Sequence, residues 1–176
     1  LSDLLSNPAP ETVLSRSFAA LILAELMRSD AINPFMSDAE RQALLDATAN
    51  ALRDETEYRG LYATLGWVHP VAHMADMLCR FSLHPSTTAD QGRAILRAAR
   101  TKVSPGAVVY SFNEPDRLAR AVSTLVARER VPAAEVVAWL VSFAYPGAGE
   151  KWSVAVRSPR GMAGVRNSKL VLGGLE

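Results

Sequence analysis

Helical periodicity, broken at intervals by helix-stop signals, is the feature that most limits the folds open to this chain. Between residues 12 and 29 the apolar residues Leu14, Phe18, Leu21 and Ile22 recur every three or four positions, which is typical of one side of an amphipathic helix. Pro34 ends this segment, and the same kind of pattern then returns. We expect helices at residues 12–29, 38–52, 68–83, 88–101, 116–130 and 132–145.

The expected helices come in pairs. First and second members alternate, the first members beginning near Thr12, Val68 and Pro115 and the second near Asp38, Thr88 and Pro132. Equivalent members are offset by roughly 45 to 55 residues, close to the roughly 40 to 47 of HEAT and armadillo repeats. The spacing predicts an all-α protein of stacked helical hairpins, a short HEAT/armadillo-like α-solenoid, in preference to a four-helix bundle.

Local signals place some of the helix ends. Ser37 with Glu40, and Thr88 with Gln91, have the form of capping boxes, in which each side chain bonds a free backbone N–H at the helix start. Residues 55–65 are expected to form a short helical turn closed by Gly66. Towards the end of the chain the helical pattern weakens. Residues 152–156 suit either a short strand or a helical turn, and we expect a last short helix at 167–172.

Length and composition favour a single domain over residues 1–176, with a weakly ordered or irregular segment at about 146–165. The 176 residues are 49% hydrophobic, which is enough for one continuous core without disulfides or a structural metal. The only cysteine, Cys79, excludes an intrachain disulfide and suits a reducing compartment. We expect its thiol to be buried and inert.

Charge and hydropathy narrow the partners. The formal net charge is +1 and basic residues are scattered among acids, without the basic surface of a nucleic-acid binder. Glu25 and the segment 146–150 break the longest apolar runs, well short of the roughly 20 residues that span a bilayer. The sequence therefore predicts a soluble, cytoplasmic protein that binds neither nucleic acid nor membrane, and it leaves the oligomeric state open.

All three histidines lie between Gly66 and Pro85. His69, His73 and Asp76 are spaced i, i+4 and i+7, so on a helix their side chains project from one face within roughly 60° of one another. His84, directly before Pro85, is interpreted as a helix-terminating residue.

Three interpretations of this stripe are open. His69, His73 and Asp76 are candidate ligands of a divalent metal, because histidines at i, i+4 chelate such ions and an aspartate supplies a third ligand. The same residues also suit a metal-free polar pocket or a structural hydrogen-bond cluster. The metalloprotease pattern HExxH is absent, since Pro70 follows His69.

Two neighbouring segments carry further candidates. If residues 55–65 fold back, Glu57 and Arg59 frame the cavity beside the histidines, with Trp67 as an apolar wall; alternatively, the acid and the arginine only tie a turn to its neighbour. Asn113 is expected to cap the helix that follows it. Because first helices lie side by side in a hairpin array, Glu114 or Arg117 then reach the same groove.

Together the motifs resemble a known family. ETEYRGLYATLGWVHPVAHMADML, NEPDRLARAV, RSFAALILAEL and RNSKLVLGGL are similar to segments of the bacterial domain of unknown function 2785 family. The resemblance implies an all-helical, HEAT-like protein and brings no established activity. Pro70 and Met74 stand where the family usually has small residues. The family's polar core maps onto Glu55, Glu57, Arg59, Gly60, Gly66, Trp67, His69, His73 and Asp76.

Two functions follow from these residues. The first is a binding module whose pocket, formed by His69, His73, Asp76, Glu57, Arg59 and Trp67, holds a small molecule, a peptide or a protein partner. The second is a metal-dependent hydrolase in which the His69, His73 and Asp76 cluster binds a divalent ion and Glu57 or Glu55 is the general base.

Overall fold

Two rows of helices form most of the structure, a computed structural model that describes residues 1–4, 10–103, 108–145 and 151–175. The first row contains α1 (Val13–Ile32), α3 (Pro70–Leu83) and α5 (Glu114–Ala127), side by side. Behind it lie α2 (Asp38–Asp54) and α4 (Ala89–Val103), which contact each other and the first row. The chain is all-α, as the sequence predicts.

The C-terminal helices extend this arrangement. α6 (Ala133–Val141) follows α4 in the second row: Trp139 Nε1 donates to the Leu96 carbonyl at 2.8 Å, and Arg93 forms an ion pair with Glu135. α8 (Pro159–Gly173) packs against α5 and α4 instead of lengthening either row. The pairs agree with stacked hairpins, and a HEAT/armadillo-like solenoid stays a prediction.

Side-chain caps fix the start of both helices for which the sequence predicts capping boxes. Ser37 Oγ accepts the Glu40 N–H at 3.3 Å, and the Glu40 carboxylate accepts the Ser37 N–H at 2.8 Å. At the start of α4, Thr88 and Gln91 exchange the same two bonds at 3.3 and 3.0 Å. Both predicted boxes are confirmed.

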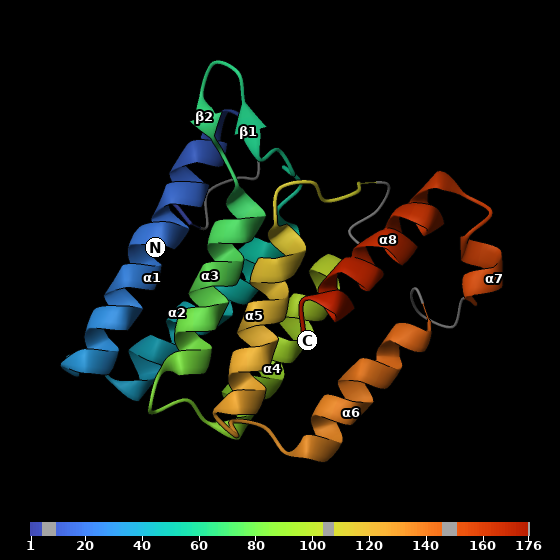
Figure 1. Cartoon of the computed structure of the whole chain (residues 1–176). Coiled ribbons are helices and arrows are strands. Elements are labelled where there is room, and N and C mark those ends of the chain that lie inside the picture. The colour runs from blue at the N-terminus through green and yellow to red at the C-terminus, as the bar shows by residue number, and fades with distance from the viewer. Residues whose placement is uncertain (5–9, 104–107, 146–150, 176) are drawn as a thin grey trace.

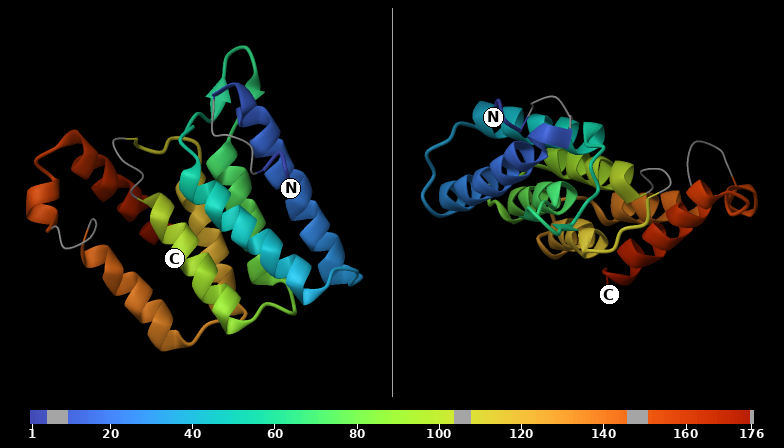
Figure 2. Two further views of the ribbon diagram at one scale, coloured as in Figure 1. Left: turned by 180° about the vertical axis from the view of Figure 1, so that it is seen from behind. Right: turned by 90° about the horizontal axis from the view of Figure 1, so that it is seen from above.

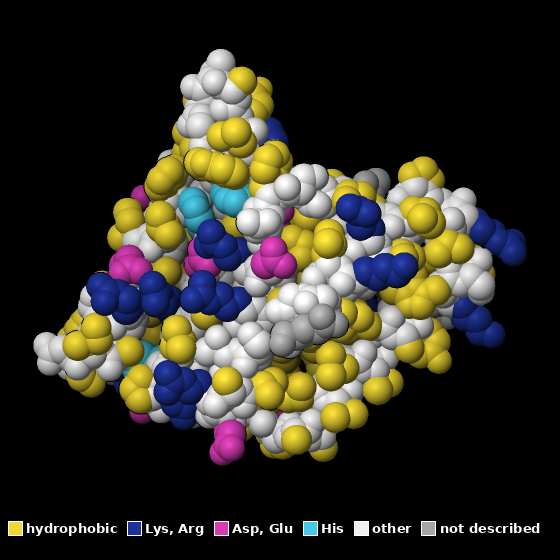
Figure 3. Space-filling view, in the orientation of Figure 1, with side chains coloured by type: hydrophobic (Ala, Val, Ile, Leu, Met, Phe, Trp, Pro, Cys, Tyr) yellow, Lys and Arg dark blue, Asp and Glu magenta, His cyan; other side chains and the backbone are white. Residues whose placement is uncertain are grey.

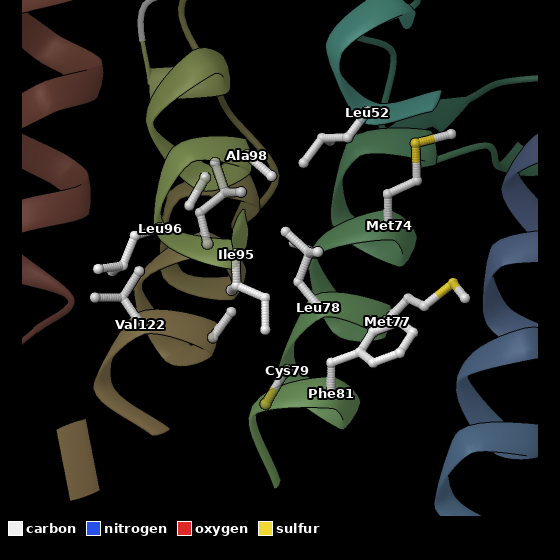
Figure 4. Packing of buried hydrophobic residues seen from close by; sticks show 14 of the residues in the cluster. Leu52, Met74, Met77, Leu78, Cys79, Phe81, Ile95, Leu96, Ala98 and Val122 are labelled. Carbon is white, nitrogen blue, oxygen red and sulfur yellow. The ribbon is translucent and has the colours of Figure 1, made fainter. Parts of the chain in front are cut away.

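The core is centred on α3, which has neighbours on three sides. Met74 and Leu78 are fully buried, and Phe81 is 2% exposed. Leu78 points towards Ile95 of α4, whereas Phe81 points to the opposite side of α3 (Figure 4), and all belong to one buried cluster. Because α3 is packed against α1, α5 and the second row, only a stripe of half-buried residues along it reaches the surface.

The helical turn expected at 55–65 is wrong. Residues 55–60 form no helix, and the antiparallel hairpin of β1 (Leu61–Tyr62) and β2 (Gly66–Trp67) follows. Gly66 closes the hairpin at φ 75°, where a side chain is strained. At Gly60 an added Cβ meets the ring of Phe112 at 2.2 Å, so the chain needs glycine there to pass close to the segment before α5.

The C-terminal part is more helical than expected. Residues Trp152–Ala155 form the short helix α7, not a strand, and α8 begins at Pro159, well before the expected residue 167. The described part of the segment expected to be irregular, 151–165, is therefore mostly helical, and 146–150 lies outside the described residues. Gly161 and Gly164 weaken the helical pattern of the sequence here, although Ser158 caps α8 by accepting the Gly161 N–H.

Other helix ends differ by a few residues from those expected, and α3 begins at Pro70 instead of Val68. No helix in the described part of the chain combines the length and the apolar character that crossing a membrane requires.

Candidate functional site

A cleft of about 760 Å³ opens where α3 and α5 begin, at the hairpin end of the first row. In Figure 3 the two cyan histidine patches near the upper end of this face lie between hydrophobic and basic side chains. The cleft combines apolar walls with imidazole, amide, hydroxyl and guanidinium groups. Its lining residues are Phe18, Leu21, Leu65, Trp67, His69, His73, Ser111, Phe112, Asn113 and Arg117.

Two residues of the cleft have left-handed backbones. His69 (φ 48°) precedes α3 and Asn113 (φ 66°) precedes α5, and both helices have a proline in the first turn. Such a conformation costs about 1–3 kcal/mol for a residue other than glycine, less for asparagine. At His69 the loop holds it in place, because the His69 N–H donates to the Arg59 carbonyl at 3.1 Å.

Hydrogen bonds determine which nitrogen of His73 carries a proton. The Ser17 hydroxyl donates its only proton to the Val68 carbonyl, so its oxygen can only accept from His73 Nδ1 at 2.8 Å. The Ser17 carbonyl, 3.3 Å from the same nitrogen, is also an acceptor. Nδ1 must therefore carry the proton.

The other nitrogen of His73 is an unused acceptor. Burial lowers the pKa of His73, and the nearby His69 and Arg117 act in the same direction, while the Ser17 carbonyl and Asp76 oppose them. The ring is thus neutral near pH 7, and Nε2 keeps a lone pair. Nε2 has no hydrogen-bond partner among the described residues.

His69 is held on three sides. Its Nε2 lies 2.6 Å from the Phe112 carbonyl and 3.4 Å from Glu114 Oε1; both accept, so Nε2 is the donor. Trp67 stacks on the ring at 5.0 Å between centroids, and the His73 ring lies 6.0 Å away. Burial raises the pKa of Glu114, but bonds from His69 and backbone N–H groups outweigh it and lower the pKa below its ordinary value.

Arg117 brings a positive charge to the cleft. Its Nη1 donates to Asp76, one turn after His73 on α3, and its side chain is 39% exposed. No other nitrogen of this guanidinium has a partner within the described ranges. Arg117 can thus bind an anionic group while Asp76 holds it in position.

The predicted site residues fall into two groups. Trp67, His69 and His73 line the cleft, and Asp76 reaches it only through Arg117. Glu57 and Arg59 do not line it. They form an ion pair with each other at 2.5 Å, and the Arg59 guanidinium lies over the Tyr62 ring. This pair corresponds to the alternative in which the acid and the arginine tie a turn together.

Three other residues of this region are engaged elsewhere. Glu55, considered as a general base, is buried and receives two hydrogen bonds from Arg16, at 2.8 and 2.9 Å. Cys79 is buried and 3.6 Å from Thr124 Oγ1. His84 ends α3 at its opposite end, where it contacts Asp30.

The metal interpretation gains no support from this geometry. Among the residues that the structure describes, no group of three or more histidine, cysteine, aspartate or glutamate side chains is placed to hold a metal ion. His69 and His73 lie close together, but Asp76, the third candidate ligand, is bound to Arg117.

Sequence reasoning missed the side of the cleft that α1 supplies. Ser17 orients His73, and the ring of Phe18 contacts His73 edge-on at 5.8 Å. Phe18 lies within a regular apolar pattern, which marks a helix face but not whether that face is covered. It is 45% exposed, and exposure of this kind is not encoded in helical spacing.

Comparison with known proteins places the chain in a family. The family model described as "Protein of unknown function (DUF2785)" matches residues 1–172. The chain therefore belongs to this family, and the resemblance noted in the sequence is confirmed. Neither a curated protein nor a solved structure matches the chain.

Proposed function

We propose that this protein is a binding module whose cleft holds a ligand with three features: an anionic group, a hydrogen-bond donor and an apolar part. The single observation that carries the proposal is the orientation of His73, whose Nδ1 proton is fixed by Ser17. An oriented, neutral imidazole with an unused lone pair in a cleft is suited to accept a hydrogen bond from a ligand.

The other lining residues support the two remaining features. Arg117 supplies donors for a carboxylate, and charge-assisted hydrogen bonds of this type are about twice as strong as neutral ones. Trp67 is 51% exposed and Phe18 45%, so both have apolar area that a ligand can cover. Exposed aromatic groups beside a few polar ones are typical of small-molecule and peptide sites.

The proposal extends to partners and location. A net charge of +1 supports a partner other than nucleic acid, because nucleic-acid affinity depends on neutralising phosphates. A single, buried cysteine supports a cytoplasmic location, where thiols stay reduced.

The test is a titration with N-acetyl-L-phenylalanine, which combines a carboxylate, one amide N–H and an apolar ring. We expect it to shift the NMR signals of the Trp67 indole and the His73 ring. The matched probe N-acetyl-L-phenylalaninamide has no negative charge and should bind at least tenfold more weakly, because it cannot form the ionic bond to Arg117.

Variants locate the binding. His73→Ala and Arg117→Gln should each weaken N-acetyl-L-phenylalanine at least tenfold. Arg120→Gln, an exposed arginine on the same helix that does not line the cleft, should have no effect. If the probe leaves the cleft signals unchanged at millimolar concentration, or if Arg120→Gln weakens it equally, the proposal is wrong.

A further inference from the structure

We propose that the ligand is an extended acidic peptide, whose backbone pairs with residues 108–112 and whose chain continues from the cleft into a second hollow beside α8. This inference rests on the proposed function and names the partner of the same site. Its evidence lies in the segment that leads into α5, which crosses the hairpin end of the molecule between α8 and α5 (Figure 1).

One edge of this segment is already paired. The side-chain amide of Asn167, on α8, donates to the Val108 carbonyl at 2.9 Å and accepts the Tyr110 N–H at 3.1 Å. In an extended chain, a carbonyl and the N–H two residues later point to the same edge. Asn167 thus binds this edge as a neighbouring strand would.

On the opposite edge, within the described part of the chain, the backbone groups of Val109 and Ser111 are open except for the Val109 carbonyl, which accepts the Ser111 hydroxyl at 3.5 Å. In an extended chain the groups of the intervening residues, Val109 and Ser111, point away from Asn167. Both residues are exposed, and no described residue bonds the backbone N–H of either one or the carbonyl of Ser111. Unpaired N–H and C=O groups on an extended edge are the surface to which a peptide adds as a further strand.

Two hollows adjoin this edge. The second has a volume of about 370 Å³, and it shares Ser111 and Asn113 with the cleft. Beyond them it is lined by residues of α5 and α8, including Arg166 and Leu170. A peptide along residues 108–112 can therefore place side chains in both hollows, whereas a small molecule fills only one.

Charge favours acidic side chains. Each hollow contains one arginine: Arg117 in the cleft and Arg166 in the second. Arg166 is exposed and has no acidic partner among the described residues. Asp116 is the one acidic residue lining the second hollow. Basic side chains also lie over α8 in Figure 3. In the cleft, an N–H group of the peptide donates a hydrogen bond to His73 Nε2.

The experiment compares N-acetyl-L-phenylalanine with a pentapeptide whose two ends are blocked. This peptide has phenylalanine first, followed by glutamate, valine, glutamate and valine. Binding is followed by NMR on the full chain. We expect the pentapeptide to bind at least tenfold more tightly and to shift the Val109 and Ser111 amides. The same peptide with N-methylated valines, or with lysine for glutamate, should bind at least tenfold more weakly.

Paired variants separate backbone from charge. Ser111→Pro removes the open N–H and should weaken the pentapeptide at least tenfold, whereas Ser111→Ala keeps it and should not. Arg166→Glu should weaken it similarly. Lys169→Glu, exposed on α8 outside both hollows, should have little effect. Arg166→Glu and Lys169→Glu, which lie outside the cleft, should leave the affinity for N-acetyl-L-phenylalanine unchanged.

The outcomes distinguish this inference from the function on which it rests. If N-acetyl-L-phenylalanine binds in the cleft but the pentapeptide binds no more tightly, or the N-methylated peptide binds equally well, the peptide inference is overturned and the binding function stands. The N-methyl comparison uses the unaltered protein, so it decides even if Ser111→Pro does not fold. If neither probe binds, both are wrong.

Discussion

The two ends of α3 carry the same kinds of residue in opposite states. At its C-terminal end His84 meets Asp30 at 3.1 Å, and Arg41 binds the same carboxylate at 2.8 Å. At its N-terminal end the cleft is lined by His69, His73 and Arg117, and Asp76 binds Arg117. Histidine, arginine and aspartate occur at both ends, yet only one end is suited to a ligand.

At the C-terminal end the polar side-chain atoms of Asp30 and His84 all have partners within the protein. Asp30 is fully buried and accepts hydrogen bonds from Arg41 and from the backbone N–H groups of Phe35 and Met36. His84 uses both ring nitrogens, because Nδ1 accepts the Ser86 N–H at 3.2 Å. This cluster joins the end of α1, the start of α2 and the end of α3.

At the N-terminal end the hydrogen bonds orient the side chains, but some of their polar atoms have no partner among the described residues. Ser17 holds one nitrogen of His73, and Asp76 binds one nitrogen of Arg117. The comparison teaches that residue type and helical spacing do not identify a site. What matters is whether the polar atoms that remain free face a space that a ligand can enter.

Removing the negative charge of Asp30, which Arg41 and His84 share, should have the largest effect on the unfolding free energy. In Asp30→Asn, Arg41 and His84 lose a buried anionic partner, and breaking a buried ion pair costs about 3–5 kcal/mol of unfolding free energy. Asp38→Asn is the matched control, because Asp38 contacts the same Arg41 but is 91% exposed, and exposed pairs contribute little. Urea unfolding measures both. Equal losses in the two variants would show that the buried cluster is not the stronger anchor.

Truncating one histidine at each end should separate stability from binding. His84→Ala removes a buried ring with two hydrogen bonds, so we expect a loss of about 2–3 kcal/mol in unfolding free energy. His73→Ala removes a half-buried ring, and Ser17 keeps its bond to Val68, so we expect about 1 kcal/mol. In titrations with N-acetyl-L-phenylalanine we expect the reverse order, with a larger loss of affinity in His73→Ala than in His84→Ala. A His84→Ala protein that folds but no longer binds N-acetyl-L-phenylalanine would contradict this division.

The fold was largely predictable because helical periodicity and caps are local. The capping boxes at Ser37 and Thr88 give helix starts that the structure confirms. The segment 55–65 was not predictable in this way. Its course depends on Gly60 passing the ring of Phe112, a contact between residues far apart in the sequence.

The sequence brings His69 and His73 close together, as the structure does, but it does not predict the residues that surround them. The stripe of His69, His73 and Asp76 assumes that all three belong to one helix, whereas His69 is left-handed and lies before the first turn. The partner of Asp76 comes from α5, and the residue that orients His73 comes from α1. Spacing within one segment contains no information about either neighbour.

Acidification should give the smallest effect and compare the two ends once more. Burial lowers the pKa of His84, although the nearby Asp30 acts in the opposite direction, and burial also lowers the pKa of His73. As the pH falls, the unfolded chain therefore takes up these protons before the folded chain does. The contribution of the two neutral histidines to the unfolding free energy is thus fully present above about pH 6.5 and decreases as the pH drops below it.

Asp30 adds a second, more acidic window. Burial alone would raise its pKa, but bonds from Met36, Phe35 and Arg41 outweigh it and lower the pKa to about 2. Because an ordinary aspartate has a pKa of about 3.8, its contribution is present above that pH and is lost between it and about pH 2. Urea unfolding at pH 7.5, 5.5 and 3 follows both windows. His84→Ala should lose less stability than the unaltered chain between pH 7.5 and 5.5, since the proton uptake at this ring is gone. If the unaltered chain is equally stable at both pH values, the two imidazoles are not held neutral by burial, and the lone pair assigned to His73 loses its basis.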